Sequence, residues 1–237
     1  MANPFSGAPV LYYEPFTAPN GTALPFTWVM QSGLTPRDVQ ILNNRCEQPV
    51  GAAIAPYAYD SRLSIDTTQG FCISAYIAAQ DNDSAALLGL WDPSQLKEAG
   101  NSGYMQVAGA VPNPTGLTLA WNRTSVFTNA YPFPVAIRVG IEVDPVAGVV
   151  NGWATPTPVT DLTGDWQVDN TNMVKVLTLP YVGLGGPHFP GIGLGGAGNS
   201  MGWVDDIVVS RPASPPGEAC PSTFVNPVWP MPAEGEG

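Results

Sequence analysis

Residues 135–144 read VAIRVGIEVD and show the clearest alternation of side chains in this chain. Every second residue is a branched aliphatic, namely Val135, Ile137, Val139, Ile141 and Val143. Successive side chains of a β-strand point to opposite faces, so this period of two predicts a strand with one buried face. Arg138 and Glu142 would then lie on the other face.

The same pattern continues on both sides of this stretch. Phe71–Ala79 alternates in a similar way, and turn signals such as Asn20-Gly21 and Asn151-Gly152 separate further short segments. These segments are Val10–Tyr13, Thr27–Gln31, Val39–Leu42, Ala85–Trp91, Tyr104–Ala108, Leu117–Trp121, Val149–Ala154, Val174–Leu179 and Trp203–Val209. Only Pro93–Ala99 has helical character. Many short strands predict an all-β fold, here a two-sheet antiparallel β-sandwich.

The composition favours the same fold class. Among 237 residues there are 26 glycines and 26 prolines, about twice the average share of these helix breakers. This argues against a helical bundle or a doubly wound α/β fold. Hydrophobic residues make up 44% of the chain, which is typical of a globular protein.

Charge excludes several partners. The chain has 19 acidic and 8 basic residues, a formal net charge of −11 and a pI near 4.2. Nucleic acids and anionic membranes need a basic surface, so neither is expected to bind. The opening MANPFSGAP lacks the features of a signal peptide, and no apolar run reaches the ~18 residues of a membrane span. We therefore expect synthesis in a cytoplasm and no membrane insertion.

The two ends differ from the middle. Residues 1–9 form a Pro/Gly/Ala-rich arm, residues 10–211 the sandwich, and residues 212–237 a Pro-rich arm that cannot be a regular central strand. The second arm carries apolar residues that we take as candidate partner-binding anchors: Phe224, Val228, Trp229 and Met231. Either this arm docks on a neighbouring subunit or it folds back on its own domain.

The cysteines give no metal or disulfide framework. Cys46, Cys72 and Cys220 are widely spaced and form no CxxC pair. The chain holds either one disulfide or three free thiols. The single histidine, His188, has no second histidine or nearby cysteine, so no transition-metal site and no catalytic triad is predicted.

Two pairs of acids are candidates for chemistry. Glu142 and Asp144 share one face of a strand, as the acid and nucleophile of a retaining glycosidase do, although Asp144-Pro145 also fits a turn that ends the strand. Asp205 and Asp206 are adjacent, so in a regular strand they face opposite sides. Together with Asp81 and Asp83 they offer calcium ligands, but solvated turn acids are the preferred interpretation.

The segment Gly183–Gly198, GLGGPHFPGIGLGGAG, matches G-x-G-x-x-G twice. A dinucleotide site needs a helix directly after this motif, and here Asn199-Ser200-Met201-Gly202 and a strand follow. We therefore predict a long glycine loop that serves as a contact tip, and no cofactor or metal.

Aromatic residues fall into two groups. Trp28, Trp121, Trp153 and Trp203 lie in predicted strands and are assigned to the core. Others lie at strand ends or in loops, where exposed rings flanked by polar groups suit glycan binding and subunit contact equally. This second group comprises Tyr12, Tyr13, Tyr57, Tyr59, Tyr131, Phe133 and Trp166, and from it we take Tyr131, Phe133 and Trp166, with His188, as a candidate glycan or contact surface.

The ends of the predicted sandwich resemble the concanavalin A-like (LamG-like) jelly roll. The opening Glu14-Pro15-Phe16, Asn20-Gly21-Thr22, Leu24-Pro25 and Trp28, followed by Ile41 and Asn43-Asn44, is similar to its first strands. The close, Gly202–Val209, is similar to its last strand. Glu142 and Asp144 also resemble the carboxylate cluster of β-glucanases with this fold, but Pro145–Gly148 lacks the further acid of that cluster.

Such domains occur in bacteriophage virion proteins, particularly minor tail proteins of phages infecting actinobacteria. The resemblance implies a non-enzymatic structural protein of a virion, a minor tail or tail-tip component that assembles as a homo-oligomer with other virion proteins. A capsid decoration protein on the head surface is an alternative. Two further alternatives are a carbohydrate-binding module for host envelope glycans and, last, a glycan hydrolase that uses Glu142 and Asp144.

Overall fold

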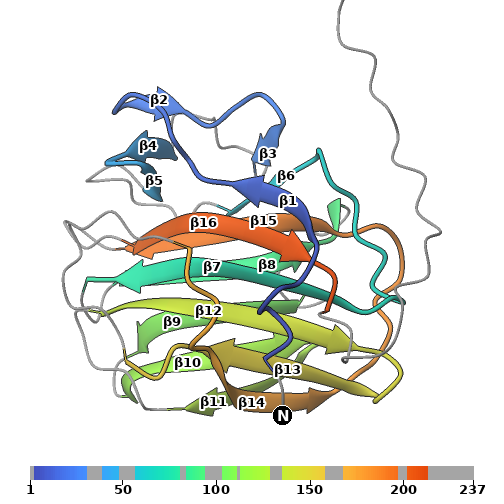
Figure 1. Ribbon diagram of the computed structural model, residues 1–237. Helices are drawn as coiled ribbons and strands as arrows, with labels where there is room; N and C mark the ends of the chain where they lie inside the picture. The colour runs from blue at the N-terminus through green and yellow to red at the C-terminus, as the bar shows by residue number, and fades with distance from the viewer. Residues whose placement is uncertain are drawn as a thin grey trace, which may run out of the picture.

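The computed structural model describes residues 3–30, 39–47, 57–80, 84–93, 103–110, 113–128, 135–157, 168–196 and 202–212. Within these ranges the chain forms β-strands and no α-helix, and the strands make two antiparallel sheets that pack face to face (Figure 1). The predicted two-sheet antiparallel sandwich is confirmed. No described helix is long and apolar enough to cross a membrane. The predicted helical segment Pro93–Ala99 lies outside the described residues from position 94 onward.

Sheet A is the front layer in Figure 1 and contains the longest strand. Its order is β14 (Val174–Pro180), β13 (Val149–Ala154), β12 (Val135–Asp144), β7 (Phe71–Ala79), β16 (Gly202–Ser210), β5 (Arg45–Glu47), β4 (Gln40–Leu42) and β2 (Thr22–Ala23), and β1 (Val10–Glu14) pairs with β16. The first and last strands of the fold, β1 and β16, therefore lie side by side.

Sheet B is the rear layer. Its order is β11 (Thr124–Thr128), β10 (Asn113–Trp121), β9 (Gly103–Ala110), β8 (Ser84–Trp91), β15 (Phe189–Gly196), β6 (Tyr57–Asp60) and β3 (Trp28–Met30). Every strand pair in the described residues is antiparallel, as in sandwiches built from hairpins and Greek-key connections.

The main core lies between the two sheets and follows from the alternation in the sequence. On β12 the aliphatic residues at odd positions, from Val135 to Val143, are fully buried, and they face Leu88, Leu90 and Met105 of sheet B. Trp28 and Trp121 belong to this core as predicted, whereas Trp153 and Trp203 are buried in two smaller clusters apart from it. These two clusters therefore form further apolar packing outside the main core.

The N-terminal segment supplies part of that packing. Phe5 is 5% exposed and packs edge-on against Trp153 of β13, with ring centroids 6.1 Å apart. The amide of Asn3 donates to the main-chain oxygens of Asn170 and Thr171. Within the predicted arm, residues 1–9, Asn3 and Phe5 therefore contact the sandwich of their own chain.

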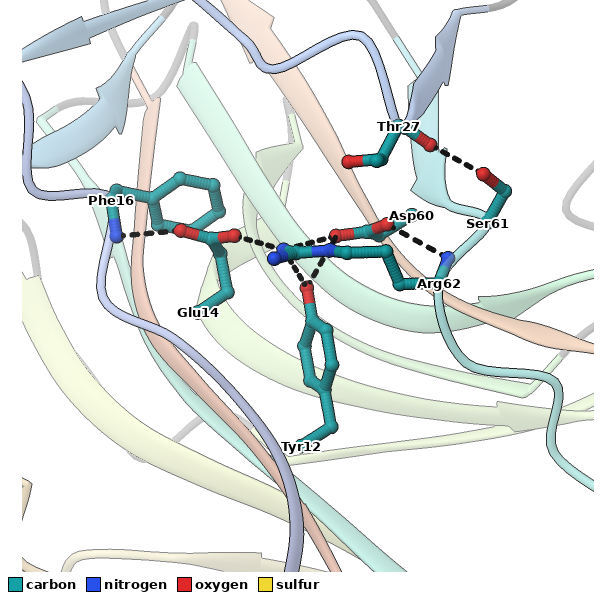
Figure 2. A network of polar contacts seen from close by, with 7 residues as sticks. All are labelled: Tyr12, Glu14, Phe16, Thr27, Asp60, Ser61 and Arg62. Carbon is teal, nitrogen blue, oxygen red and sulfur yellow. Dashed lines mark hydrogen bonds and ion pairs between the residues drawn. The ribbon is translucent and has the colours of Figure 1, made fainter. Parts of the chain in front are cut away.

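A polar network ties β1 of sheet A to β6 of sheet B (Figure 2). The guanidinium of Arg62 pairs with the carboxylates of Asp60 and Glu14, and the Tyr12 hydroxyl donates to Asp60 Oδ2 at 2.7 Å. Asp60 is fully buried, and the Arg62 side chain is 43% exposed. The network satisfies the buried carboxylates and holds this end of the sandwich together.

The predicted glycine loop is wrong over residues 189–196. This stretch is strand β15, which pairs with β8 on one side and β6 on the other. Ile192 and Leu194 point into the core, so the strand has the usual alternation with glycine on its outer face. Because glycine adds no apolar side chain to the pattern, the alternation was hidden in the sequence.

Candidate functional site

The outer face of sheet B carries a cluster of aromatic side chains, which we call the aromatic face. It is formed by Tyr57, Tyr59, Leu87, Trp91, Tyr104 and Phe189, from β6, β8, β9 and β15. Tyr57 and Tyr59 alternate with the core residue Ala58, and Trp91 alternates with Leu90. The residues of β6, β8 and β15 that alternate with the core residues therefore gather on one surface.

Glycines in β15 let two of these rings lie against the sheet. A Cβ atom on Gly191 would lie 1.7 Å from Trp91 Cδ1, and a Cβ on Gly193 would lie 2.7 Å from Tyr57 Cε1. Neither distance is sterically allowed, so only glycine permits these ring positions. Gly191 and Gly193, from the glycine-rich stretch of the sequence, thus lie directly beneath the rings of the aromatic face.

The rings contact one another and differ in exposure. Tyr57 meets Trp91 edge-on at 5.2 Å between centroids, and Tyr59 meets Phe189 at 5.1 Å. Trp91 is 1% exposed, whereas Tyr57, Tyr104 and Phe189 are half-buried. Burial raises the pKa of the Tyr59 and Tyr104 hydroxyls, so both remain neutral groups that donate and accept hydrogen bonds.

The carboxylates proposed from the sequence for hydrolysis have structural partners. Glu142 Oε2 accepts hydrogen bonds from Asn151 Nδ2 and Trp153 Nε1, each at 2.9 Å. Asp144 Oδ1 accepts the main-chain N–H groups of Val146 and Ala147, which fixes the β12–β13 turn. This geometry matches the turn interpretation of Asp144.

Asp205 and Asp206 do not face opposite sides of the sheet, and that expectation is wrong. The β16–β7 register shifts between Asp205 and Val208, and Asp206 has a left-handed backbone with φ 52°. This bulge adds one residue between the core positions Val204 and Ile207. As a result both acids line a pocket on the outer face of sheet A, away from the aromatic face.

The other predicted site residues are distributed differently. His188 is 1% exposed and its Nδ1 lies 3.2 Å from the Gly186 oxygen, so it is buried rather than presented by a loop. Tyr131, Phe133 and Trp166 lie outside the described residues, as do Phe224, Val228, Trp229 and Met231 of the Pro-rich arm and the acids Asp81 and Asp83. Their predicted roles stay predictions.

Thiols and metal ligands add no further site in the part of the chain that the structure covers. Cys46 and Cys72 are buried free thiols, and burial raises the pKa of both. Cys220 lies outside the described ranges. No group of three or more His, Cys, Asp or Glu side chains that could hold a metal occurs among the described residues.

Solved structures share the architecture. No protein-family model matches the sequence, and neither does any curated protein. The laminarinase (endo-1,3-β-glucanase) catalytic domain of Thermotoga petrophila superposes with a TM-score of 0.58 at 10% identity, over 87% of this chain and 99% of that chain. The Bauhinia forficata lectin in complex with GalNAc gives 0.52 at 13% identity, over 84% and 97%. A glycosyl hydrolase family protein from Mycobacterium fortuitum gives 0.53 at 13% identity, over 84% and 99%.

At such identities the likeness establishes the fold, a concanavalin-like jelly roll, and it corrects one prediction. The chain was expected not to be an enzyme, but two of these three structures are a glycosyl hydrolase family protein and a laminarinase catalytic domain. The architecture therefore does carry enzymes. The prediction rested on the missing acid after Asp144, the turn interpretation of Asp144-Pro145 and the lack of a catalytic triad around His188, whereas a fold of this kind also carries enzymes with other arrangements of catalytic groups.

Proposed function

We propose that this protein binds carbohydrate through the aromatic face of sheet B. The observation that carries the proposal is the gathering of Tyr57, Trp91, Tyr104 and Phe189 over glycine positions of the sheet. Aromatic rings pack against the C–H faces of pyranose rings, and phenol groups exchange hydrogen bonds with sugar hydroxyls. The jelly-roll fold, which the GalNAc-bound lectin and the laminarinase domain share, supports the same class of ligand.

The spacing of the rings favours an oligosaccharide. Tyr57 is on β6 and Tyr104 on β9, and β15 and β8 lie between them. Three strand spacings of roughly 4.8 Å separate the two strands by about 14 Å. A single sugar ring does not span that distance, so we expect several linked residues to contact the face.

The test is binding of short β-1,3-glucan oligosaccharides and of GalNAc-containing glycans by calorimetry. Tyr57→Ala and Tyr104→Ala should each weaken binding on the order of tenfold, because each removes one stacking ring and one hydroxyl. Phe26→Ala is the matched control, since Phe26 is 96% exposed and outside the cluster. Unchanged affinity in both tyrosine variants, or no binding of any of these glycans, contradicts the proposal.

Release of reducing ends is measured in the same samples. Detection of new reducing ends would extend the proposal from binding to cleavage of the bound glycan, in line with the hydrolases that share this fold.

The location of the protein is a separate proposal. The opening motif and the closing strand resemble the jelly rolls of phage virion proteins, and the Lys-poor, Gly/Pro-rich composition is compatible with that origin. From this resemblance we infer a component of a phage virion, in the tail or tail tip, with the capsid surface as the alternative. The partners would be other virion proteins contacted through residues 212–237. Immunogold labelling of intact particles separates the two locations, and particles without label on head or tail contradict both.

A further inference from the structure

Sheet A has a pocket of its own, far from the aromatic face in the fold. Its volume is about 550 Å³, within the roughly 300–1,000 Å³ of small-molecule sites. Polar groups of Tyr13, Asn44, Asn170, Asp205 and Asp206 line it. Its apolar rim includes Val10, which is 61% exposed, and Val168, which is 42% exposed.

The bulge in β16 gives this pocket its polar groups, and Arg138 supports the bulge. Arg138 is fully buried, and its Nη1 donates to the main-chain oxygen of Asp206 at 2.7 Å. Its Nε donates to Asn170 Oδ1 at 2.9 Å, and its Nη2 donates to Ser74 at 2.9 Å. One buried cation therefore positions two of the pocket residues and offsets the negative charge beside it.

Asp205 is a largely buried acid in the wall of the pocket. The residue is 5% exposed, and its Oδ1 accepts the N–H of Asp206 at 2.9 Å. The carboxyl group of Asp205 is therefore held in the wall of the pocket by a main-chain hydrogen bond.

Protonation decides what kind of ligand fits. Burial, and then the charge of Asp206, raise the pKa of Asp205 to about 8. At neutral pH Asp205 is therefore a hydroxyl donor, and its proton sits on Oδ2 because Oδ1 already accepts a hydrogen bond. The neighbouring Tyr13 hydroxyl donates to Asp206 Oδ1 at 2.5 Å and presents a ring that is 47% exposed.

These features suit a neutral ligand with many hydroxyls better than a cation. A cation gains little where one acid is protonated and the other lies next to Arg138. A sugar ring, by contrast, uses a protonated acid, a carboxylate and amides together, and its C–H face packs on Tyr13.

We propose that the pocket formed by Tyr13, Asn44, Asn170, Asp205 and Asp206 binds a single hexose unit, independently of the aromatic face. The protein then has two saccharide sites on opposite sheets, one for an extended glycan and one for a terminal sugar.

The test is calorimetric titration with D-glucose, D-galactose and N-acetyl-D-galactosamine at about pH 6.5 and about pH 9.5, on either side of the Asp205 pKa. At least one sugar should bind at the lower pH with a Kd of about 1 mM or tighter. Binding should weaken on the order of tenfold at the higher pH, where Asp205 loses the donated proton.

Variants identify the group responsible. Asp205→Ala should lose binding at both pH values, whereas Asp205→Asn keeps a donor and should bind equally at both. The charged and titratable groups that interact electrostatically with Asp205 are Asp206 on its own strand, Arg138 on β12, Arg45 and Cys46 on β5, Tyr76 on β7 and Tyr13 on β1. The pKa of Tyr13 is raised well above its ordinary value by burial and Asp206, so this hydroxyl does not titrate at the higher pH.

Asp144→Asn is the matched control, an acid on the same sheet outside the pocket, and should bind as the parent protein does. Tyr57→Ala should leave monosaccharide binding unchanged, which separates this site from the aromatic face. Absence of binding by all three sugars, or wild-type affinity in Asp205→Ala, overturns the proposal, whatever the oligosaccharide result at the aromatic face.

Discussion

At the scale of single residues, Gly191 matters because it has no side chain. The indole of Trp91 occupies the space where a Cβ of residue 191 would stand. Gly191 thus contributes to the aromatic face by leaving room for Trp91 on the neighbouring strand β8.

Gly191→Ala should therefore displace Trp91 and destabilise the fold by about 1–3 kcal/mol, the usual range for overpacking. Tryptophan fluorescence and urea unfolding measure the two effects. Gly195→Ala is the control on the same strand, because a Cβ there would lie at an ordinary 3.4 Å from the Ala85 Cβ. Equal losses in the two variants would contradict the role assigned to Gly191.

At the scale of elements, the link between β1 and β6 rests on Arg62 (Figure 2). It is the one cation that pairs with both Asp60 and Glu14 in the described part of the chain, and both acids are largely buried. Removal of Arg62 leaves these carboxylates with fewer donors in a low-dielectric environment.

Arg62→Leu should lower the free energy of unfolding by about 1–3 kcal/mol, a range reduced because part of the guanidinium faces water. Arg62→Lys keeps the charge but cannot pair with both carboxylates as the guanidinium does, so its free energy of unfolding should lie between those of the wild type and Arg62→Leu. The double variant Arg62→Leu/Asp60→Asn should regain part of the lost free energy of unfolding, since the buried charge of Asp60 is removed. Chemical denaturation of the wild type, Arg62→Leu, Asp60→Asn and the double variant gives the coupling energy between the two residues, and a value near zero would refute the link.

At the scale of the whole molecule, Asp205 makes stability depend on pH. Its pKa is raised from an ordinary value of 3.8 to about 8 in the folded chain, so the folded chain keeps a proton that the unfolded chain releases above about pH 4. The stabilisation is complete below that pH and is lost as the pH rises through about 8.

In the wild type, Asp205 should therefore lower the free energy of unfolding as the pH rises, by up to about 1.4 kcal/mol per pH unit. Asp205→Asn has no such proton, and its curve should be flatter between about pH 4 and about pH 8. Comparison of the two proteins removes the general effect of a net charge of −11. Parallel curves would show that Asp205 titrates normally.

The sequence by itself determined the class of fold. Strict alternation on β12 and β7, with turn residues between short apolar segments, leaves two packed antiparallel sheets as the arrangement that buries one face of each strand. The strands predicted around Val10, Ala85, Tyr104, Val149, Val174 and Trp203 are all present. This succeeds because alternation is a local property that the chain carries in its own order of residues.

Tertiary structure decided the rest, because the sites depend on partners distant in sequence. Strand β15 is defined by pairing with β6 and β8, since glycines on its outer face give no apolar period. The two acids of β16 face the same pocket because a bulge against β7, held by Arg138 of β12, shifts the alternation by one residue. Tyr57 and Tyr104 come together only when four strands of sheet B assemble. No local pattern encodes these long-range packing choices.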